Sequence, residues 1–572
     1  MRWVLAGFVA LATLVTFPEK RLAQAPTLAV VNARVWTGDR RRPWADAVAA
    51  AGDRIVAVGS GAEVQKIVDG TRRAGTPVRV LDARGMMLVP GFIDSHVHFL
   101  SGGFGLASVQ LRDAKTPAEF VARIKAYAAT LPAGAWITEG NWDHEQWGGE
   151  LPRRDWVDSV TPNNPVWVNR LDGHMSLGNS LALRAAGVTR ATPEVAGGTI
   201  VRHPDGEPTG VLKDNAAALV SRVVPDPPPE QQDRALDAAM RFVAQHGVTT
   251  VHNMGSWEEL AVFERARGSG RLGTRIYAAV PLATWGRLRD RVAATGRGDA
   301  WLKIGALKGF VDGSLGSHTA AMLEPFTDAP TDTGLFVNTT EDLYNWISGA
   351  DRAGLHVMVH AIGDRANRVQ LDIFDRVARE NGPRDRRFRI EHAQHLHPAD
   401  VARFGQLGVI PSMQPYHAID DGRWAEKVIG PERARGTYAF RSLLDAGASL
   451  AFGSDWFVAP PTPLEGIYAA VTRRTLDDRR PAGWIPEQKI TVEDALRAYT
   501  RGAAYAEYAE AEKGVLARGM FADFVLIDRD LTRIPPETIR EARVMLTVVG
   551  GRPVFERDGL RPAAVRKEVP SP

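Results

Sequence analysis

The sequence predicts an α/β protein, a TIM (β/α)8 barrel with a small β-sandwich domain built from both ends of the chain. Through the middle of the chain, apolar runs typical of buried strands alternate with amphipathic stretches typical of helices, which favours parallel βα units. Both ends instead carry short β-like segments separated by turn signals. We therefore assign residues 26–88 plus 514–562 to the sandwich and residues 89–513 to the barrel.

The first 25 residues differ from the rest and resemble a secretory signal peptide. Arg2 precedes an apolar run from Trp3 to Phe17, and Ala23-Gln24-Ala25 offers a cleavage site with small residues. The run is shorter than the roughly 20 residues of a membrane span. We expect residues 1–25 to be removed, no membrane span to remain, and the mature protein to be periplasmic or secreted. An uncleaved N-terminal anchor is the competing interpretation.

The β-like segments of the two ends are short and bounded by glycine turns. At the N-terminal end they are Leu28–Val31, Ala47–Ala49 and Arg54–Gly59, and at the C-terminal end Ala522–Asp528 and Val544–Phe555. Gly52-Asp53 and Gly59-Ser60-Gly61 mark turns between them. Because both ends have the same texture, we expect them to form one sheet domain.

Eight apolar runs between the two ends are the candidate barrel strands. In order they are Leu88–Phe99, Pro165–Arg170, Val248–Asn253, Ile304–Val311, Leu355–His360, Phe388–His392, Val409–Met413 and Ser449–Ser454. Helical patterns lie between several of them, at Glu230–His246, Thr340–Ala353 and Arg365–Asn381. The distance from the first run to the second exceeds an ordinary βα loop, which predicts an insertion there.

Composition narrows the functional classes. Hydrophobic residues make up 44% and charged residues 24% of the chain, as in ordinary globular proteins. The formal net charge is only +3, and the basic residues are interspersed with acidic ones. A nucleic-acid-binding surface would cluster them, so we expect no nucleic acid partner. The chain has no cysteine, which excludes disulfides and thiolate metal ligands.

The most informative motif is Asp94-Ser95-His96-Val97-His98, at the end of the first apolar run. Residues two apart on a strand point to the same face, so His96 and His98 can present two imidazoles to one metal ion. A single His-x-His pair is weak evidence by itself. It gains weight because further candidate ligands occur at or near the ends of later strands, at Lys308, His360, His392 and Asp455. In a TIM barrel these strand ends form the catalytic face.

With these motifs the sequence resembles the amidohydrolase superfamily, and within it amidohydrolase family 3, the YtcJ-like group that includes N-substituted formamide deformylases. The resemblance covers essentially the whole mature chain. Besides the metal motifs it includes Trp136-Ile137, Asn141-Trp142-Asp143, Trp147, Arg170-Leu171-Asp172-Gly173-His174, Asn179, Asp312-Gly313-Ser314-Leu315-Gly316-Ser317 and Ala522-Asp523-Phe524-Val525. Together these motifs are highly specific.

The resemblance implies a metal site built from His96, His98, Lys308, His360, His392 and Asp455. Imidazoles and a carboxylate suit two divalent ions, for which zinc is the expected metal. Burial lowers the pKa of a lysine, and its free amine can add carbon dioxide. The resulting carbamate on Lys308 would supply an anionic oxygen that bridges both ions. Lys303, five residues earlier, is expected to be a solvated side chain.

The implied reaction is hydrolysis of a non-peptide C–N bond in a small-molecule amide, such as an N-acyl or N-formyl compound. Asp455 would act as general base and then acid, and His174 would polarise the carbonyl. The residues that we expect near the substrate are Trp142, Asp143, His174, Asp312 and Trp456.

The remaining histidines receive lesser roles. His356 is expected deeper in the barrel, His252 is an ambiguous strand end, and Asp312, Glu391 and His318 are candidates to support the metal ligands. The other histidines are interpreted by default as surface or loop residues, and His144 is the least certain of them: His144, His203, His246, His395, His397 and His417.

Two alternative functions stay open. One is a mononuclear deaminase-type hydrolase that uses His96, His98, His392 and Asp455, with Lys308 as a structural residue. The other is a non-catalytic exported binding protein on a decayed barrel, which stays open because fold alone never guarantees activity. The complete ligand set disfavours it, because a decaying site would be expected to lose some of its ligands. The oligomeric state is open, with a homodimer as one candidate.

Overall fold

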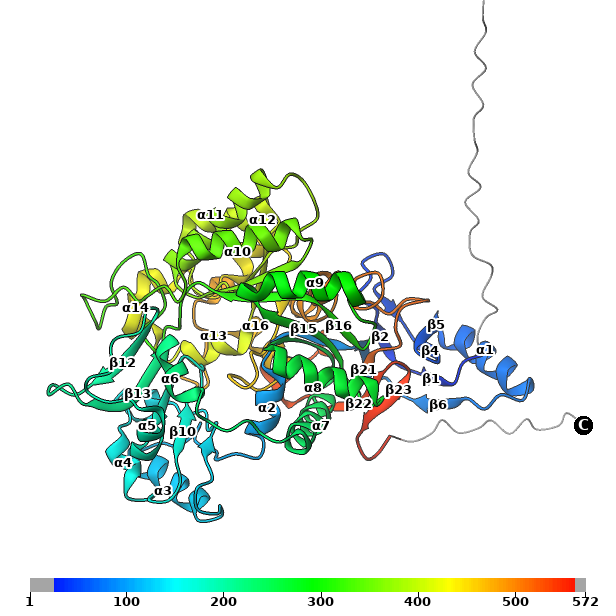
Figure 1. The fold of residues 1–572 in the computed structure, drawn as a ribbon. Coiled ribbons are helices and arrows are strands. Elements are labelled where there is room, and N and C mark those ends of the chain that lie inside the picture. Colours follow the sequence, from blue (N-terminus) through cyan, green and yellow to red (C-terminus); the bar gives the residue numbers. More distant parts are fainter. Residues whose placement is uncertain (1–24, 561–572) are drawn as a thin grey trace, which may run out of the picture.

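The computed structural model describes residues 25–560. Figure 1 shows a central barrel with a β-sandwich on one side and a separate insertion on the other. The expected signal peptide, residues 1–25, lies outside the described residues except for Ala25. Among residues 25–560, no helix is both long and apolar enough to cross a membrane.

Eight strands form the barrel, and every neighbouring pair is parallel. In sheet order they are β8 (Phe92–Val97), β14 (Val248–Met254), β15 (Arg275–Pro281), β16 (Leu302–Phe310), β17 (His356–Ala361), β18 (Arg389–His392), β19 (Ile410–Met413) and β20 (Ala451–Phe452). A parallel bridge from Val97 to Trp456 brings the end of the sheet back to its beginning. The predicted α/β barrel class is confirmed.

The prediction of the second barrel strand was wrong, whereas the predicted third strand, Val248–Asn253, is β14 and lies next to β8 in the barrel. Pro165–Arg170 contains β10 (Val166–Asn169), which pairs with β9 and β11 in a separate sheet. The strand missed from the sequence is β15, between β14 and β16. Both segments are apolar and bounded by turns, and periodicity cannot tell which sheet a buried strand joins. Only the pairing decides it.

Helices cover the outside of the barrel. They are α8 (Trp257–Gly268), α9 (Trp285–Thr295), α10 (Thr340–Arg352), α11 (Asp364–Glu380), α12 (Pro398–Leu407), α15 (Phe440–Asp445), α16 (Pro463–Thr472) and α17 (Val492–Arg497). Helix α10 begins where the Thr339 side chain accepts a hydrogen bond from the Asp342 amide, the usual role of an N-cap threonine. Helix α11 buries Leu371, Phe374 and Val377 along one face. The predicted helices at 340–353 and 365–381 are confirmed.

The small domain consists of two sheets that enclose a common apolar core. The first sheet has the order β5 (Arg54–Gly59), β4 (Ala47–Ala51), β1 (Leu28–Val31) and β6 (Arg79–Asp82). The second has the order β23 (Arg552–Glu556), β22 (Val544–Val549), β21 (Phe524–Ile527), β7 (Met87–Pro90), β2 (Arg34–Trp36) and β3 (Trp44–Ala45). Helix α1 (Gly61–Arg73) covers the outer face of the first sheet. Strand β7 leads directly into barrel strand β8, which joins the two domains.

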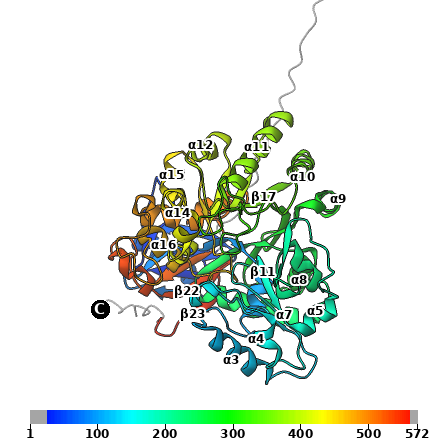
Figure 2. The same cartoon turned by 90° about the vertical axis from the view of Figure 1, so that its left-hand side faces the viewer.

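Residues 98–247 form the insertion between the first two barrel strands. Its sheet has the order β12 (Gly198–Arg202), β13 (Pro208–Asp214), β11 (Met175–Gly178), β10 and β9 (Ile137–Thr138). Helices α3 (Pro117–Ala128), α4 (Arg154–Asp158) and α5 (Ser180–Ala186) lie around this sheet, as the side view shows (Figure 2). Helix α2 (Phe99–Gly105) leaves the barrel and packs against α7 (Pro229–Gln245), which returns to it.

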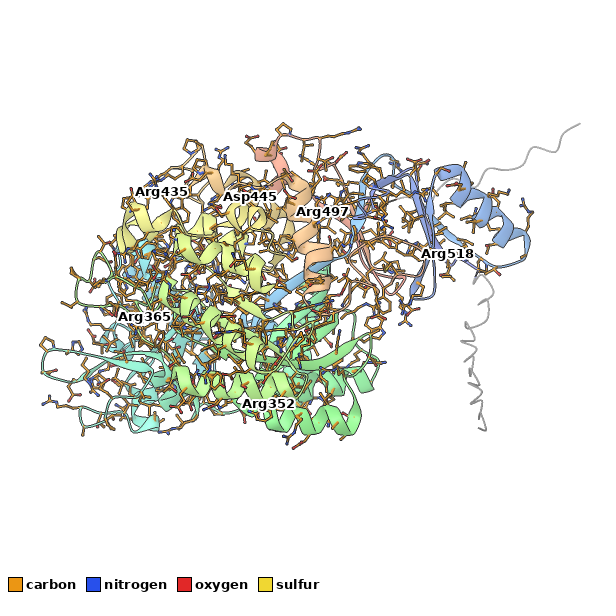
Figure 3. The ribbon with its side chains drawn as sticks, turned by 90° about the horizontal axis from the view of Figure 1, so that it is seen from above. Arg352, Arg365, Arg435, Asp445, Arg497 and Arg518 are labelled. Atoms are coloured by element: carbon orange, nitrogen blue, oxygen red, sulfur yellow. The ribbon has the colours of Figure 1, made fainter. Side chains whose placement is uncertain are left out.

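Charged side chains are spread over the surface. Arg352, Arg435 and Arg518 are exposed and lie on separate parts of the molecule (Figure 3). The apolar core instead lies between the barrel strands and their helices. This packing fixes the positions of the strand ends.

Candidate metal centre and active site

The predicted metal ligands meet at the carboxyl end of the barrel. His96 lies on β8, His98 directly follows it, and Lys308 lies on β16. The others are His360 on β17, His392 at the end of β18 and Asp455 after β20. All are buried except His98, which is 27% exposed. Parallel strands place their carboxyl ends on one face, which is why residues far apart in sequence come together.

Asp455 is the centre of this group. Its Oδ1 lies 3.4 Å from His96 Nε2 and 3.4 Å from His98 Nε2. Lys308 Nζ lies 3.2 Å from His96 Nε2. The ring of His392 lies 4.8 Å from the ring of His96 and 4.5 Å from that of His360, measured between centroids. His392 and Asp455 both adopt a left-handed backbone, with φ of 75° and 60°, a strained conformation that collects at functional sites.

Neighbouring groups fix which nitrogen of each imidazole faces the centre. The Glu391 carboxylate lies 2.7 Å from His96 Nδ1, and the Gln414 side-chain oxygen lies 2.8 Å from His392 Nδ1. The Gly313 carbonyl lies 3.0 Å from His360 Nε2. The opposite nitrogens, His96 Nε2, His392 Nε2 and His360 Nδ1, are therefore left to act as ligands. Such hydrogen bonds are typical of metal-binding histidines.

The protonation states suit metal binding. Burial lowers the pKa of His96 to about 4 and holds those of His360 and His392 well below the usual value. Burial opposes ionisation of Asp455, but His96 and His98 keep its pKa well below the ordinary range. At neutral pH the imidazoles of His96, His360 and His392 are therefore neutral, and Asp455 is a carboxylate.

These groups fit a cation. Asp455 Oδ1 is buried and has no hydrogen-bond donor within the described part of the chain. With Nδ1 of His96 hydrogen-bonded to Glu391, its Nε2 offers a lone pair to Lys308 Nζ or to a cation, and it faces the Asp455 oxygen as a second acceptor. Buried acceptors without a proton between them are costly, and a divalent metal ion would satisfy them together.

A pocket opens beside this centre, on the side of His360, His392 and Asp455. The sequence placed His174 at the end of a barrel strand, but the structure places it between β10 and β11 of the insertion. It still lines the pocket. Its Nδ1 lies 2.7 Å from Asp214 Oδ1, and its ring is 4.9 Å from that of His360. Burial lowers the pKa of His174, but Asp214 and the carboxylates nearby outweigh burial, so the net pKa is raised.

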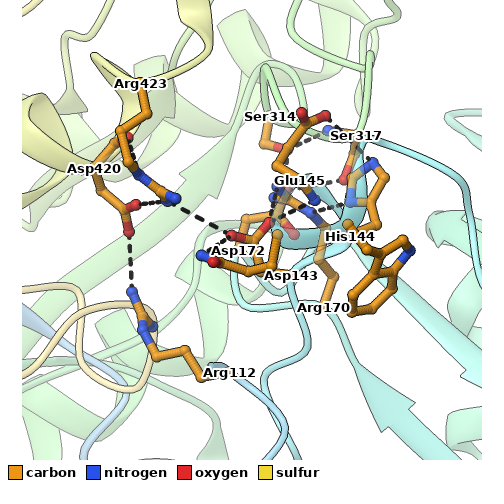
Figure 4. A network of polar contacts seen from close by, with 12 residues as sticks. Arg112, Asp143, His144, Glu145, Arg170, Asp172, Ser314, Ser317, Asp420 and Arg423 are labelled. Atoms are coloured by element: carbon orange, nitrogen blue, oxygen red, sulfur yellow. Dashed lines mark hydrogen bonds and ion pairs between the residues drawn. The ribbon is translucent and has the colours of Figure 1, made fainter. Parts of the chain in front are cut away.

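A network of ion pairs ties the insertion to the barrel loops around the pocket (Figure 4). Arg170 bridges Asp143 and Asp172, at 3.4 Å and 2.6 Å. The Ser317 hydroxyl donates to Asp172 at 2.9 Å, and Ser314 also contacts that carboxylate. On the other side, Arg112 and Arg423 share Asp420, and Arg423 lies 3.6 Å from Asp143. The network fixes the outer wall of the pocket.

Of the expected substrate contacts, Asp143 and His174 line the pocket, and three others lie elsewhere. Trp142 is fully buried in the core of the insertion, and its indole donates to the Val168 carbonyl. Trp456 packs against Phe99 and Phe242 beneath the site. Asp312 accepts three backbone hydrogen bonds and lies 3.5 Å from His360 Nε2. Trp142 and Trp456 therefore serve packing, and Asp312 supports His360.

Several histidines that were expected at the surface are buried. His144 pairs with Arg170, and His395 with Thr437. His417, in α13 (Pro415–Asp421), lines the pocket next to His392 and Asp455. His417 follows the predicted strand Val409–Met413 by four residues. The strand-end rule that located the metal ligands could therefore have found it. Arg170, Asp420 and Asp421 also line the pocket and were not predicted.

Comparison with known proteins shows to which protein family the chain belongs. The sequence profile of the amidohydrolase family matches residues 79–555. The chain therefore belongs to the amidohydrolase family, and the expectation of an amidohydrolase-type enzyme is confirmed.

Among curated proteins, the chain is 41% identical to protein LONG AFTER FAR-RED 3 of Arabidopsis thaliana, over 92% of this chain and 91% of that one. It is 30% identical to the putative amidohydrolase YtcJ of Bacillus subtilis, over 83% and 90% of the two chains. It is 29% identical to an N-substituted formamide deformylase of Arthrobacter pascens, over 94% and 100%. The resemblance to YtcJ-like proteins and deformylases is thus confirmed.

Among solved structures, an uncharacterised metal-dependent hydrolase from Pyrococcus horikoshii matches with a TM-score of 0.72 and 26% identity. The match covers 89% of this chain and 99% of that one.

Proposed function

We propose that this protein hydrolyses non-peptide C–N bonds in N-acyl or N-formyl amides with the help of metal ions. One observation carries the proposal: Asp455 Oδ1 is buried, has no hydrogen-bond donor among residues 25–560, and lies 3.4 Å from both His96 Nε2 and His98 Nε2. The similarity to the N-substituted formamide deformylase of Arthrobacter pascens supports the substrate class.

The residues that would hold two divalent ions are His96, His98, Lys308, His360, His392 and Asp455. Nitrogen and oxygen ligands of this kind favour zinc. When bound, such ions would polarise the substrate carbonyl and lower the pKa of water.

Lys308 would act as a carbamate. Burial lowers the pKa of Lys308 to about 8, so an appreciable fraction of its side chain is the free amine at neutral pH. That amine adds carbon dioxide and releases one proton. The product places an anionic oxygen close to His96, where a bare ammonium group would repel a metal ion.

Asp455 and His174 supply the proton and charge chemistry. Asp455 accepts a proton from the attacking water and delivers it to the leaving nitrogen as the C–N bond breaks, which yields the carboxylic acid and the amine. His174, whose pKa is raised chiefly by Asp214 against the effect of burial, is suited to donate a hydrogen bond to the carbonyl oxygen as it gains negative charge.

Metal analysis tests this proposal. We expect about two ions per chain in the wild type and a sharp loss in Lys308→Ala, because that variant lacks the proposed anionic oxygen ligand. Lys303→Ala is the matched control, since Lys303 lies on the same strand but donates to the Glu507 carbonyl away from the site. Metal-loaded protein is then screened against a panel of formamides and N-acyl amines. Full metal content without hydrolysis across the panel would contradict the proposal.

A mononuclear deaminase-type hydrolase is the second candidate. It is favoured by the 3.2 Å contact between Lys308 Nζ and His96 Nε2, which an unmodified amine can make as a hydrogen bond. A content of one ion per chain that is unchanged in Lys308→Ala would favour the mononuclear hydrolase.

The role of Asp455 has its own test. Asp455→Asn keeps an oxygen ligand but cannot carry the proton, so we expect metal content to stay near that of wild type. Turnover should fall by roughly 100- to 10,000-fold, the usual contribution of general acid–base catalysis. An Asp455→Asn enzyme with near-normal kcat would remove Asp455 from this role.

A further inference from the structure

His417 is a buried histidine at the active site that the proposed mechanism does not use. It lies in α13, the helix that follows barrel strand β19. No predicted metal ligand comes from that strand. Its side chain is nine-tenths buried, with 9% of the residue exposed. Its Nε2 has no hydrogen-bond partner within residues 25–560.

The position of His417 points to the substrate side of the centre. A ring nitrogen of His417, a ligand nitrogen of His392 and a carboxylate oxygen of Asp455 all lie within 4.8 Å of one another. His417 lines the pocket together with His392 and Asp455, whereas His96, His98 and Lys308 do not line it. Its ring stacks at 6.4 Å on that of His392, so it stands beside the ligands and toward the pocket.

Two histidines outside the ligand set therefore face the pocket. His174 lies beside His360, and His417 lies beside His392. Hydrolysis of an amide has two sites that need a hydrogen-bond partner, the carbonyl oxygen and the leaving nitrogen. His174 is assigned to the oxygen, and Asp455, which must reach the nitrogen to protonate it, lies close to His417.

The chemistry of the leaving nitrogen fixes the kind of partner that it needs. Its lone pair takes the proton from Asp455, so the N–H bond of a monosubstituted amide is left as a donor. A donor in a buried pocket requires an acceptor. Within residues 25–560 His417 Nε2 has no hydrogen-bond partner, so in the tautomer with its proton on Nδ1 this nitrogen is free to accept.

We propose that His417 Nε2 accepts the N–H of the scissile amide, and that His417 makes the enzyme selective for N-monosubstituted over N,N-disubstituted amides. This inference rests on the proposed amide hydrolysis. An N,N-disubstituted amide has no N–H to donate and would leave Nε2 unsatisfied, which costs binding.

The test uses two metal-chelating probes that differ by one methyl group. Benzohydroxamic acid has an N–H bond, and N-methylbenzohydroxamic acid carries a methyl group in place of that hydrogen. The dissociation constants of both probes are measured by calorimetry on the metal-loaded wild type and on two metal-loaded variants. His417→Leu removes the acceptor, and His417→Gln restores one. His203→Leu, in a loop of the insertion, is the control variant. Metal content and melting temperature are measured for each.

We expect wild type to prefer the N–H probe by about tenfold, the usual value of one buried hydrogen bond. The preference should vanish in His417→Leu, return in part in His417→Gln and persist in His203→Leu. Metal content should not change. Comparison of two probes on each variant cancels general effects of the substitution. The same preference should appear in turnover, as a kcat/KM ratio of formanilide to N-methylformanilide that falls in His417→Leu.

Two outcomes would overturn the inference. If His417→Leu keeps the preference for the N–H probe, His417 does not contact the nitrogen. If His417→Leu loses a metal ion, His417 is a ligand and not a substrate contact. Failure of the proposed function looks different, because wild type would then hold no metal or bind neither probe, and the role of His417 would fall with it.

Discussion

At the scale of single residues, the orientation of the predicted metal ligands depends on side chains outside the predicted ligand set. Glu391 is fully buried and orients His96 through the 2.7 Å contact to Nδ1. Arg389 holds Glu391 in turn, with 2.8 Å between Nε and Oε1. Burial opposes ionisation of Glu391, yet Arg389 and His96 keep its pKa far below the usual value. The carboxylate therefore stays ionised and fixes the ring orientation of His96.

Glu391→Gln tests this support. The amide keeps the shape but loses the charge that favours Nδ1–H on His96, so we expect metal affinity to fall by about 10- to 100-fold. Competition with a chelator measures the metal affinity of both proteins. Gln414→Ala, which removes the oxygen next to His392 Nδ1, should weaken metal binding in the same direction. Unchanged affinity in Glu391→Gln would mean that packing alone orients His96.

At the scale of elements, α2 connects the first metal motif to the insertion. It begins directly after His98 and packs against α7. The contact is close because Gly102 and Gly103 have no side chains. A Cβ on Gly102 would lie 2.5 Å from the Trp456 ring, and one on Gly103 would lie 2.2 Å from the Ala235 carbonyl. The position of His98 thus depends on two glycines on the adjacent turn.

Gly103→Ala should therefore destabilise the protein by about 1–3 kcal/mol, because the clash is with backbone and forces α2 away from α7. Gly105→Ala is the matched control in the same helix. A Cβ there meets nothing within 4 Å, so we expect no loss and up to about 1 kcal/mol of gain from helix propensity. Thermal melting of both variants gives the comparison, and equal melting temperatures would contradict the packing argument.

At the scale of the whole molecule, a buried ion pair fastens the β-sandwich to the bottom of the barrel. Arg275, on β15, binds Asp523 with contacts of 2.7 Å and 3.0 Å. Asp523 also accepts a hydrogen bond from the Gly550 amide, in the turn after β22. Both side chains are almost completely buried. The sandwich is thus tied to the barrel by this buried charged contact as well as by apolar packing.

Asp523→Ala leaves Arg275 buried without a counterion, and we expect a loss of about 3–5 kcal/mol in stability. Glu556→Ala breaks the exposed pair with Arg79 and should cost at most about 1 kcal/mol. Denaturant unfolding of the two variants measures both. A similar small cost in each would show that apolar packing alone joins the domains.

Much of the site followed from the sequence because strand ends in a parallel barrel converge regardless of what lies between them. The predicted ligands from His96 to Asp455 came from the family resemblance, supported by their positions at or near the ends of apolar runs. The substrate contacts did not follow, since Trp142 and Trp456 are apolar side chains whose exposure depends on neighbours from other segments. His417 was overlooked because nothing local to a histidine in a short helix shows whether it faces solvent or a pocket.

The sequence by itself therefore determined the barrel, the sandwich from both ends and the predicted set of ligand positions, because periodicity and residue chemistry are local properties. The tertiary structure decided which apolar runs became barrel strands, how the insertion closes the pocket and which charges meet around it. Those outcomes depend on pairing and packing between distant segments. For that reason β10 joined the insertion, β15 took its place in the barrel, and Arg170 and His417 came to line the pocket.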